Sequence, residues 1–276
     1  MSAPILTDAT ANAALRGQGY VILDLLPPEA VNALLAVFNA HEALHRFDFI
    51  ASVLLPDHGL RASVHDGVAP LLRRHVMPLL PGHRLVLGSF ATKRAAAPMG
   101  QMPLHQDCSF TDETRGTGIT LWCPLVDVGP ENGMLGVVPG SHLLANAQRD
   151  AKPLLPLETH AEIEARYLRG LPMRAGQVLV MDNRLVHGSR PNLGNAARPV
   201  AAGVAVPADA PLLCCYADEN STPPVTEIYA VPDDFYLRHA MCTRPREGTH
   251  LATVPRMLEA LTSPRMRALL GEITPA

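Results

Sequence analysis

The sequence predicts a mainly β fold with flanking helices, and two observations support this prediction. Beyond Pro81 the chain breaks into short apolar or alternating runs separated by Gly, Pro, Asn and Asp, which is typical of a β sandwich or barrel. Before Pro81, apolar residues recur at helical spacing. A length of 276 residues suits a single domain. We divide it into a helical part (about 1–82), a β-rich core (about 83–206) and a C-terminal extension (about 207–276).

The helical part begins with residues 9–47, which a short predicted strand at 17–26 interrupts. Pro27-Pro28-Glu29 is a helix start signal for the segment that follows. Residues 48–66 lack periodicity, so we expect a loop there, either a lid over a substrate or a plain surface loop. A second helix is predicted over 67–80, ending at Pro81-Gly82.

The β-rich core contains six predicted strands. A charged insertion at about 143–170 interrupts them and is predicted to be a loop plus a helix. The extension is rich in proline, and a helix is predicted near 252–271. The predicted strands lie within 84–93, 101–110, 118–128, 133–141, 177–189 and 197–206.

Composition and charge limit the classes of function. The net charge of −3 leaves no basic surplus for binding nucleic acid. No segment approaches the roughly 18 apolar residues of a membrane span, and the first residues lack signal-peptide features, so we expect a cytoplasmic protein without membrane contact. The five cysteines contain no CxxC pair, which favours reduced thiols. Cys214 and Cys215 should pack on opposite faces of a strand.

His105-Gln106-Asp107, followed far downstream by His187, is the pattern with the most chemical content. Two imidazoles and one carboxylate can hold one face of an iron(II) ion and leave the other face open. The triplet alone is common by chance, and His160-Ala161-Glu162 is a rival. Residues i and i+2 share a face on a strand but not on a helix. His105 lies in a predicted strand and His160 in a predicted helix, so we favour the first triplet.

His187 and Arg198 are candidate partners of this triplet. His187 follows Asp107 by 80 residues, which permits two antiparallel strands of one barrel. Arg198 comes 11 residues later, after a turn-rich segment that can return it beside His187. Its guanidinium could clamp a carboxylate, and Ser189 could add a hydroxyl donor. The alternatives are a hydrogen-bonded histidine in the core or a loop, a surface arginine and a surface or turn serine.

Taken together, these residues resemble the phytanoyl-CoA dioxygenase family of iron(II)- and 2-oxoglutarate-dependent oxygenases. The resemblance covers roughly residues 17–206, and the extension carries no motif of the family. The order and spacing of the matching elements agree with the family. They are Pro103-Leu104-His105-Gln106-Asp107, Trp122, Glu131-Asn132-Gly133, Val138-Pro139-Gly140-Ser141-His142, His187-Gly188-Ser189, Pro191-Asn192 and Arg198.

The resemblance implies a double-stranded β-helix, that is, a cupin-like jelly roll, as the core. It implies that His105, Asp107 and His187 are iron ligands, whereas His142 belongs to a structural turn. Four residues are implied at the 2-oxoglutarate site. These are Arg198 and Ser189 at the distal carboxylate, Trp122 against the co-substrate, and Lys93 approaching the same pocket.

The resemblance also implies a reaction in which iron(II), 2-oxoglutarate and dioxygen oxidise an unactivated C–H bond, with release of succinate and carbon dioxide. We expect hydroxylation of a small polar metabolite, an amino acid or a natural-product intermediate, by a monomer or homodimer. Asp107 argues against halogenation, because halogenating relatives replace this carboxylate. A zinc-dependent hydrolase with the same ligands and a non-catalytic jelly-roll binding protein are the alternatives.

Overall fold

A six-stranded antiparallel sheet forms one wall of the molecule. The structure, a computed structural model, describes residues 4–144, 148–151, 157–256 and 268. The strand order β1-β8-β5-β10-β3-β2 is far from the chain order, as expected for a jelly roll. The six strands are β1 (Tyr20–Asp24), β2 (Phe49–Ala51), β3 (His83–Lys93), β5 (Ile119–Pro124), β8 (Gln177–Asp182) and β10 (Val200–Pro207).

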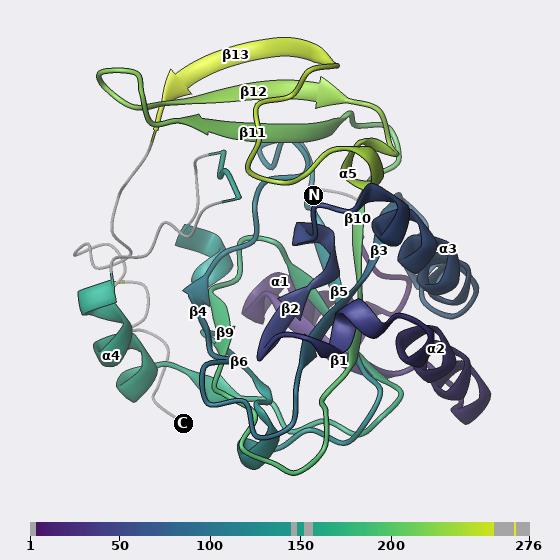
Figure 1. Cartoon of the computed structure of the whole chain (residues 1–276). Helices are drawn as coiled ribbons and strands as arrows, with labels where there is room; N and C mark the ends of the chain where they lie inside the picture. Colours follow the sequence, from purple (N-terminus) through teal and green to yellow (C-terminus); the bar gives the residue numbers. More distant parts are fainter. Residues whose placement is uncertain (1–3, 145–147, 152–156, 257–267, 269–276) are drawn as a thin grey trace.

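A four-stranded antiparallel sheet, in the order β4-β9-β6-β7, faces the first (Figure 1). Alternate residues of strand β8 pack into two different apolar clusters, one on each face of the sheet. Val178 and Val180 pack toward the helices, while Leu179 and Met181 join Leu135 of β6 between the sheets. The predicted jelly-roll core is therefore confirmed. The four strands are β4 (Met102–His105), β6 (Leu135–Val137), β7 (Arg169–Gly170) and β9 (His187–Ser189).

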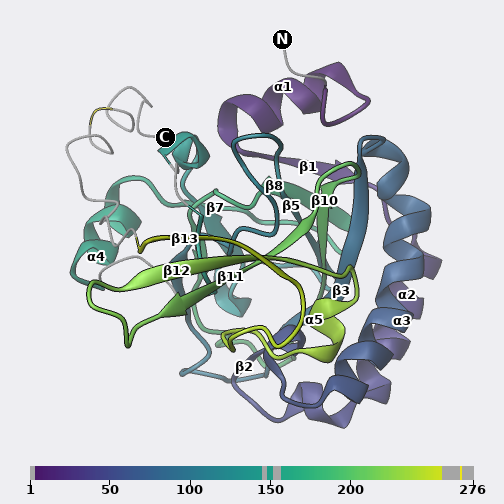
Figure 2. The same ribbon diagram turned by 90° about the horizontal axis from the view of Figure 1, so that it is seen from above.

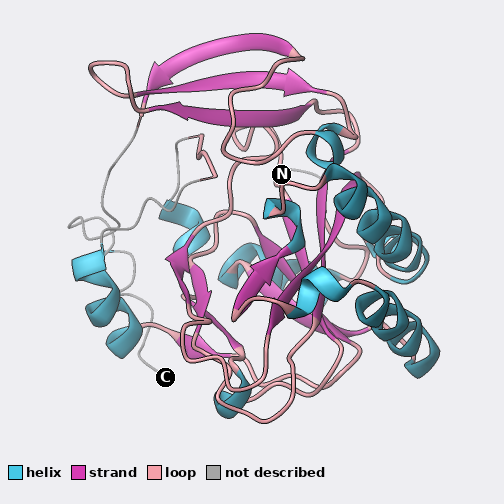
Figure 3. Cartoon of the chain, in the orientation of Figure 1, coloured by secondary structure: helices cyan, strands magenta, loops and turns pink. Residues whose placement is uncertain are grey.

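Helices cover the outer face of the six-stranded sheet (Figure 3). Helix α3 begins at His58, because the Asp57 side chain accepts a hydrogen bond from the backbone amide of Leu60 at 3.0 Å and caps the helix. The prediction of a helix over 67–80 was therefore wrong at its start and end. The helices on this face are α1 (Ala9–Gln18), α2 (Pro28–Ala40) and α3 (His58–His75).

The segment 48–66, predicted to be a loop, contains regular secondary structure. It contains β2, a 3-10 helix and the first turns of α3. Strand β2 has only three residues, and its pairing with β3 fixes it at the sheet edge. Helix α4 (Leu157–Arg166) confirms the helix predicted in the charged insertion. The 3-10 helices are η1 (Glu42–His45), η2 (Ser52–Leu54), η3 (Met77–Leu79), η4 (Pro130–Asn132) and η5 (Ser141–Leu144).

The C-terminal extension forms a separate three-stranded sheet that lies outside the jelly roll (Figures 1 and 2). The helix predicted near 252–271 was wrong for 252–255, which pair with β12, and almost all later residues lie outside the described part. Cys214 and Cys215 pack into different apolar clusters, as predicted. The elements are β11 (Leu212–Asp218), β12 (Val225–Val231), α5 (Phe235–Arg238) and β13 (Thr249–Pro255).

Among the described residues, no helix combines the length and apolar character needed to cross a membrane. The division of the chain at about residues 82 and 206 stays a prediction.

Candidate metal centre and adjoining cavity

Three side chains that are distant in sequence meet at one end of the paired strands β4 and β9. His105 lies directly opposite His187 in the strand register, and Asp107 follows two residues after β4 ends. Nε2 of His105 lies 3.9 Å from Oδ1 of Asp107, and Nε2 of His187 lies 3.8 Å from the same oxygen. Both distances are shorter than twice a usual metal–ligand bond of about 2.1 Å. The ligand atoms of the three residues all lie within 4.8 Å of one another, so they could hold one metal ion.

The two imidazoles are oriented for metal binding by their own strands. Nδ1 of His105 lies 2.9 Å from the carbonyl of Pro103, and Nδ1 of His187 lies 2.9 Å from the carbonyl of Leu185. A carbonyl only accepts, so each Nδ1 carries the proton and each Nε2 keeps its lone pair. Burial, assisted by the neighbouring His187, lowers the pKa of His105 to about 4. This imidazole is neutral at neutral pH, as a ligand must be.

The carboxylate of Asp107 is held by neighbours that the sequence reasoning missed. The hydroxyl of Thr120 donates to Oδ2 at 2.6 Å, which leaves Oδ1 facing the histidines. The backbone amide of Asp107 donates to the carbonyl of Asn183 at 3.0 Å, and Arg149 Nε donates to the Asp107 carbonyl at 2.9 Å. A weak signal existed for Thr120. It lies two residues before Trp122 on β5, so both side chains face the same side.

A cavity of about 370 Å³ adjoins the three ligands, and Arg198 lines it. The Arg198 side chain is 1% exposed. Nη1 donates to the carbonyl of Ala91 at 3.1 Å, whereas the buried Nε has no hydrogen-bond partner. Burial lowers the pKa of Arg198 to about 9, so the guanidinium is still charged at neutral pH. Among the described residues, no carboxylate forms an ion pair with it, and a buried cation of this kind requires an anion.

The other residues predicted for the 2-oxoglutarate site are Trp122, Ser189 and Lys93. The ring of Trp122 lies 5.5 Å from the Arg198 guanidinium carbon, and Trp122 and Ser189 both line the cavity. Lys93 exchanges two backbone hydrogen bonds with Arg198 but does not line the cavity. Its amine donates to the carbonyls of Ser189, at 3.0 Å, and Arg190. Lys93 thus anchors the strand end that follows His187.

Among the side chains that the structure describes, no other histidine belongs to this cluster. Nε2 of His142 bonds the carbonyl of Arg16 at 3.0 Å and the ring is buried, which confirms a structural role. His160 lies in helix α4, as predicted, but its side chain lies outside the described residues.

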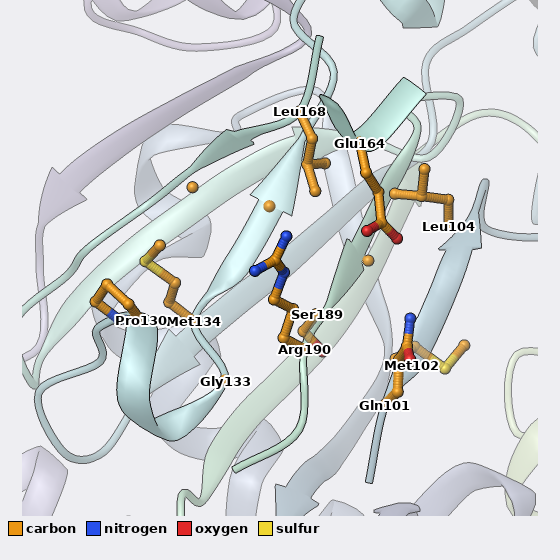
Figure 4. A pocket seen from close by; sticks show the side chains of 13 residues that line it. Gln101, Met102, Leu104, Pro130, Gly133, Met134, Glu164, Leu168, Ser189 and Arg190 are labelled. Atoms are coloured by element: carbon orange, nitrogen blue, oxygen red, sulfur yellow. The ribbon is translucent and has the colours of Figure 1, made fainter. Parts of the chain in front are cut away.

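A second cavity, of about 210 Å³, lies on the other side of the four-stranded sheet, toward α4 (Figure 4). Glu164 and Arg190 line it beside apolar side chains that include Met134 and Leu168. None of the three candidate metal ligands belongs to its lining. It is therefore distinct from the three candidate metal ligands, although Met102 and Ser189 line both cavities.

Two histidines, one aspartate and a buried arginine inside a jelly roll define a protein of the cupin-like class with a two-histidine, one-carboxylate site. The chain belongs to the phytanoyl-CoA dioxygenase (PhyH) family, whose model matches residues 15–200. This is the family of iron(II)- and 2-oxoglutarate-dependent oxygenases that the motifs resembled.

Solved structures share this fold. The carbocyclase SnoK from nogalamycin biosynthesis is 23% identical, with 76% of this chain and 89% of that chain covered and a TM-score of 0.54. The epimerase SnoN in complex with Fe3+, alpha ketoglutarate and nogalamycin RO is 23% identical, with 88% and 94% covered and a TM-score of 0.53. EctD from S. alaskensis, with 2-oxoglutarate and 5-hydroxyectoine, is 20% identical, with 76% and 83% covered and a TM-score of 0.53. No curated protein matches the sequence.

Proposed function

We propose that the protein is an iron(II)- and 2-oxoglutarate-dependent dioxygenase that hydroxylates an unactivated C–H bond of a small metabolite or natural-product intermediate. Succinate and carbon dioxide are the other products. The observation that carries this proposal is the buried Arg198 guanidinium, which has an unpartnered Nε and shares a cavity with three oriented metal ligands. A metal site alone would not need such a cation. A co-substrate that carries a carboxylate at each end needs both the metal site and the cation.

In this proposal His105, Asp107 and His187 hold the iron through Nε2, Oδ1 and Nε2. Arg198 and Ser189 bind the distal carboxylate of 2-oxoglutarate, and Trp122 lies beside it. When bound, iron and 2-oxoglutarate supply the capacity to activate dioxygen and oxidise a C–H bond. The residues of the chain orient these groups and exclude water from them.

Asp107 favours hydroxylation over halogenation. Its carboxylate can occupy the third protein position on the metal, and the Thr120 hydroxyl bond at 2.6 Å holds it there. The similar solved structures include an epimerase and a carbocyclase. We propose hydroxylation as the outcome for this chain.

The test is anaerobic addition of iron(II) and 2-oxoglutarate, which we expect to give the weak visible absorption band of an iron–keto-acid chelate. His187→Ala should abolish the band and succinate formation, whereas the matched variant His160→Ala should retain both. Equal loss in both variants would refute the choice of ligands. Tight zinc binding without a band would favour the hydrolase. A screen of small molecules for stimulated succinate release would then identify the substrate.

A further inference from the structure

The cavity extends beyond the candidate metal ligands into a region that we name the substrate half. Among the described residues that line it, the charged or chargeable oxygen and nitrogen groups are those of His105, Asp107, His187 and Arg198, all of which the proposed function uses. The substrate half is defined by the apolar side chains of Val53, Leu54, Leu87, Phe110, Val204 and Met241.

The substrate half lies directly beside the metal centre. Leu87, Val204 and Thr120 occupy paired positions on the adjacent strands β3, β10 and β5, so their side chains form one row on one face. Within that row, the Thr120 hydroxyl donates to Asp107. A molecule that contacts Leu87 and Val204 therefore has its nearest atoms next to the proposed iron ligands.

A second row, on the same face, sets the boundary between the two halves. Ser89, Ala202 and Trp122 occupy paired positions on the same three strands. The Trp122 ring contacts the Arg198 guanidinium. Ala202 also lines the cavity, and its small side chain leaves space next to Trp122. The hydroxyl of Ser89 lines the cavity and has no hydrogen-bond partner among the described residues, so it is a polar group available to a ligand.

Two segments that are distant in sequence close the outer side of the substrate half. Val53 and Leu54 come from η2, and Met241 follows helix α5 in the C-terminal extension. Arg61 of α3, which is 2% exposed, joins them by donating to the carbonyls of Leu55 and Tyr236. The extension, for which the sequence indicated no role, thus supplies part of the cavity wall.

We propose that the substrate half binds an uncharged, mainly apolar molecule, and that Leu54 and Met241 select it. The inference rests on the proposed function, because iron and 2-oxoglutarate must occupy the four charged residues. A charged group that enters an apolar cavity without a partner loses its hydration and gains nothing in return. A zwitterionic amino acid is therefore excluded as the part of the substrate that enters, while an apolar ring or chain with one hydroxyl or carbonyl near Ser89 fits.

The test compares two probes that share one ring system and differ in charge, methyl 2-naphthoate and 2-naphthoate. Binding is measured by calorimetry under anaerobic conditions with iron(II) and saturating 2-oxoglutarate, so that Arg198 is occupied. We expect the ester to bind at least about tenfold more tightly than the carboxylate. Equal binding, or no binding of either probe, would overturn the inference.

A lysine in the wall should reverse this preference. Leu54→Lys adds a cation to the lining, so the carboxylate should gain and the ester should lose affinity. Leu251→Lys is the matched control, because Leu54 and Leu251 are each 52% exposed but only Leu54 lines the cavity. Met241→Lys repeats the test with a lining residue from the C-terminal extension. If the Leu54 and Met241 variants keep the preference of the control, the assignment of the wall is wrong.

The absorption band recorded in the same samples separates this inference from the proposed function. A normal band together with no preference for the ester overturns only the substrate class. A missing band overturns the proposed function itself.

Discussion

Lys93 and Arg198 are two buried basic residues at paired backbone positions, and the amide of each donates to the carbonyl of the other, at 3.2 Å and 2.8 Å. The charge of Arg198 is the second cause, after burial, that lowers the pKa of Lys93, to about 6. Two such groups side by side are unfavourable without an anion. An anion bound at Arg198 would offset this effect and favour the charged form of the Lys93 amine.

The first prediction concerns Arg198. Arg198→Met removes the guanidinium and should weaken 2-oxoglutarate binding by about 2–5 kcal/mol, the range for losing one partner of a buried charge pair. Iron binding should change little, because the metal ligands are separate residues. Both affinities can be measured anaerobically, with the visible band reporting 2-oxoglutarate and a metal-binding dye reporting iron. If the variant loses iron binding but keeps its 2-oxoglutarate affinity, the role proposed for Arg198 is wrong.

The second prediction is that 2-oxoglutarate binding is coupled to proton uptake by Lys93. With a pKa of about 6, the amine is mostly neutral at about pH 7.5. A bound carboxylate favours the charged amine and raises this pKa, so a proton is taken up between the free and the bound pKa values. Below about pH 6 the amine is protonated in both states and the uptake disappears.

Calorimetry in two buffers of different ionisation enthalpy measures this uptake. Lys93→Met keeps an apolar stem of similar length and should abolish it, while Arg94→Met, a change at the neighbouring exposed residue, should leave it intact. Identical uptake in the wild type and in Lys93→Met would remove Lys93 from the explanation.

The metal ligands were predictable from the sequence because each follows or ends a strand with a recognisable pattern. His105 and Asp107 share spacing i and i+2, and His187 follows the apolar run that forms β8. His105 ends β4, as predicted, but Asp107 lies two residues beyond the strand, so the expectation that both share one strand was wrong for Asp107. The rival His160 lies in a helix, as its charged surroundings indicated.

The residues that were not predictable act through contacts across the fold. Thr120 meets Asp107 only because β5 and the loop after β4 come together, and Arg149 reaches the same loop from the charged insertion. Strand β2 has three residues, too few to show a period. Strand β13 is mostly exposed, so its sequence carries little apolar signal, and pairing with β12 determines its structure.

The third prediction concerns the hydroxyl that orients Asp107. Thr120→Val keeps the shape of the side chain but removes the hydrogen bond at 2.6 Å, so Oδ2 loses its donor and the carboxylate can rotate. Removing such a contact to a metal ligand typically lowers metal affinity about 10–100-fold. Competition with a metal-binding dye would measure the change, and Thr120→Ser, which keeps the hydroxyl, should stay near wild type. A loss in Thr120→Ser as large as in Thr120→Val would point to packing of the methyl group instead.

The last prediction concerns the ion pair behind the metal loop. Nη2 of Arg149 lies 2.6 Å from Oε1 of Glu113, and the two side chains are only 4% and 8% exposed. Arg149 Nε also donates a hydrogen bond to the Asp107 carbonyl. Arg149→Met leaves the Glu113 carboxylate buried without this partner, so the free energy of unfolding should fall by about 3–5 kcal/mol. Urea denaturation of the metal-free protein measures this loss. Adding Glu113→Gln to Arg149→Met removes the stranded charge and should restore part of the stability, although the Asp107 contact stays broken. A double variant that is less stable than Arg149→Met alone would show that the unpaired carboxylate is not the main cost.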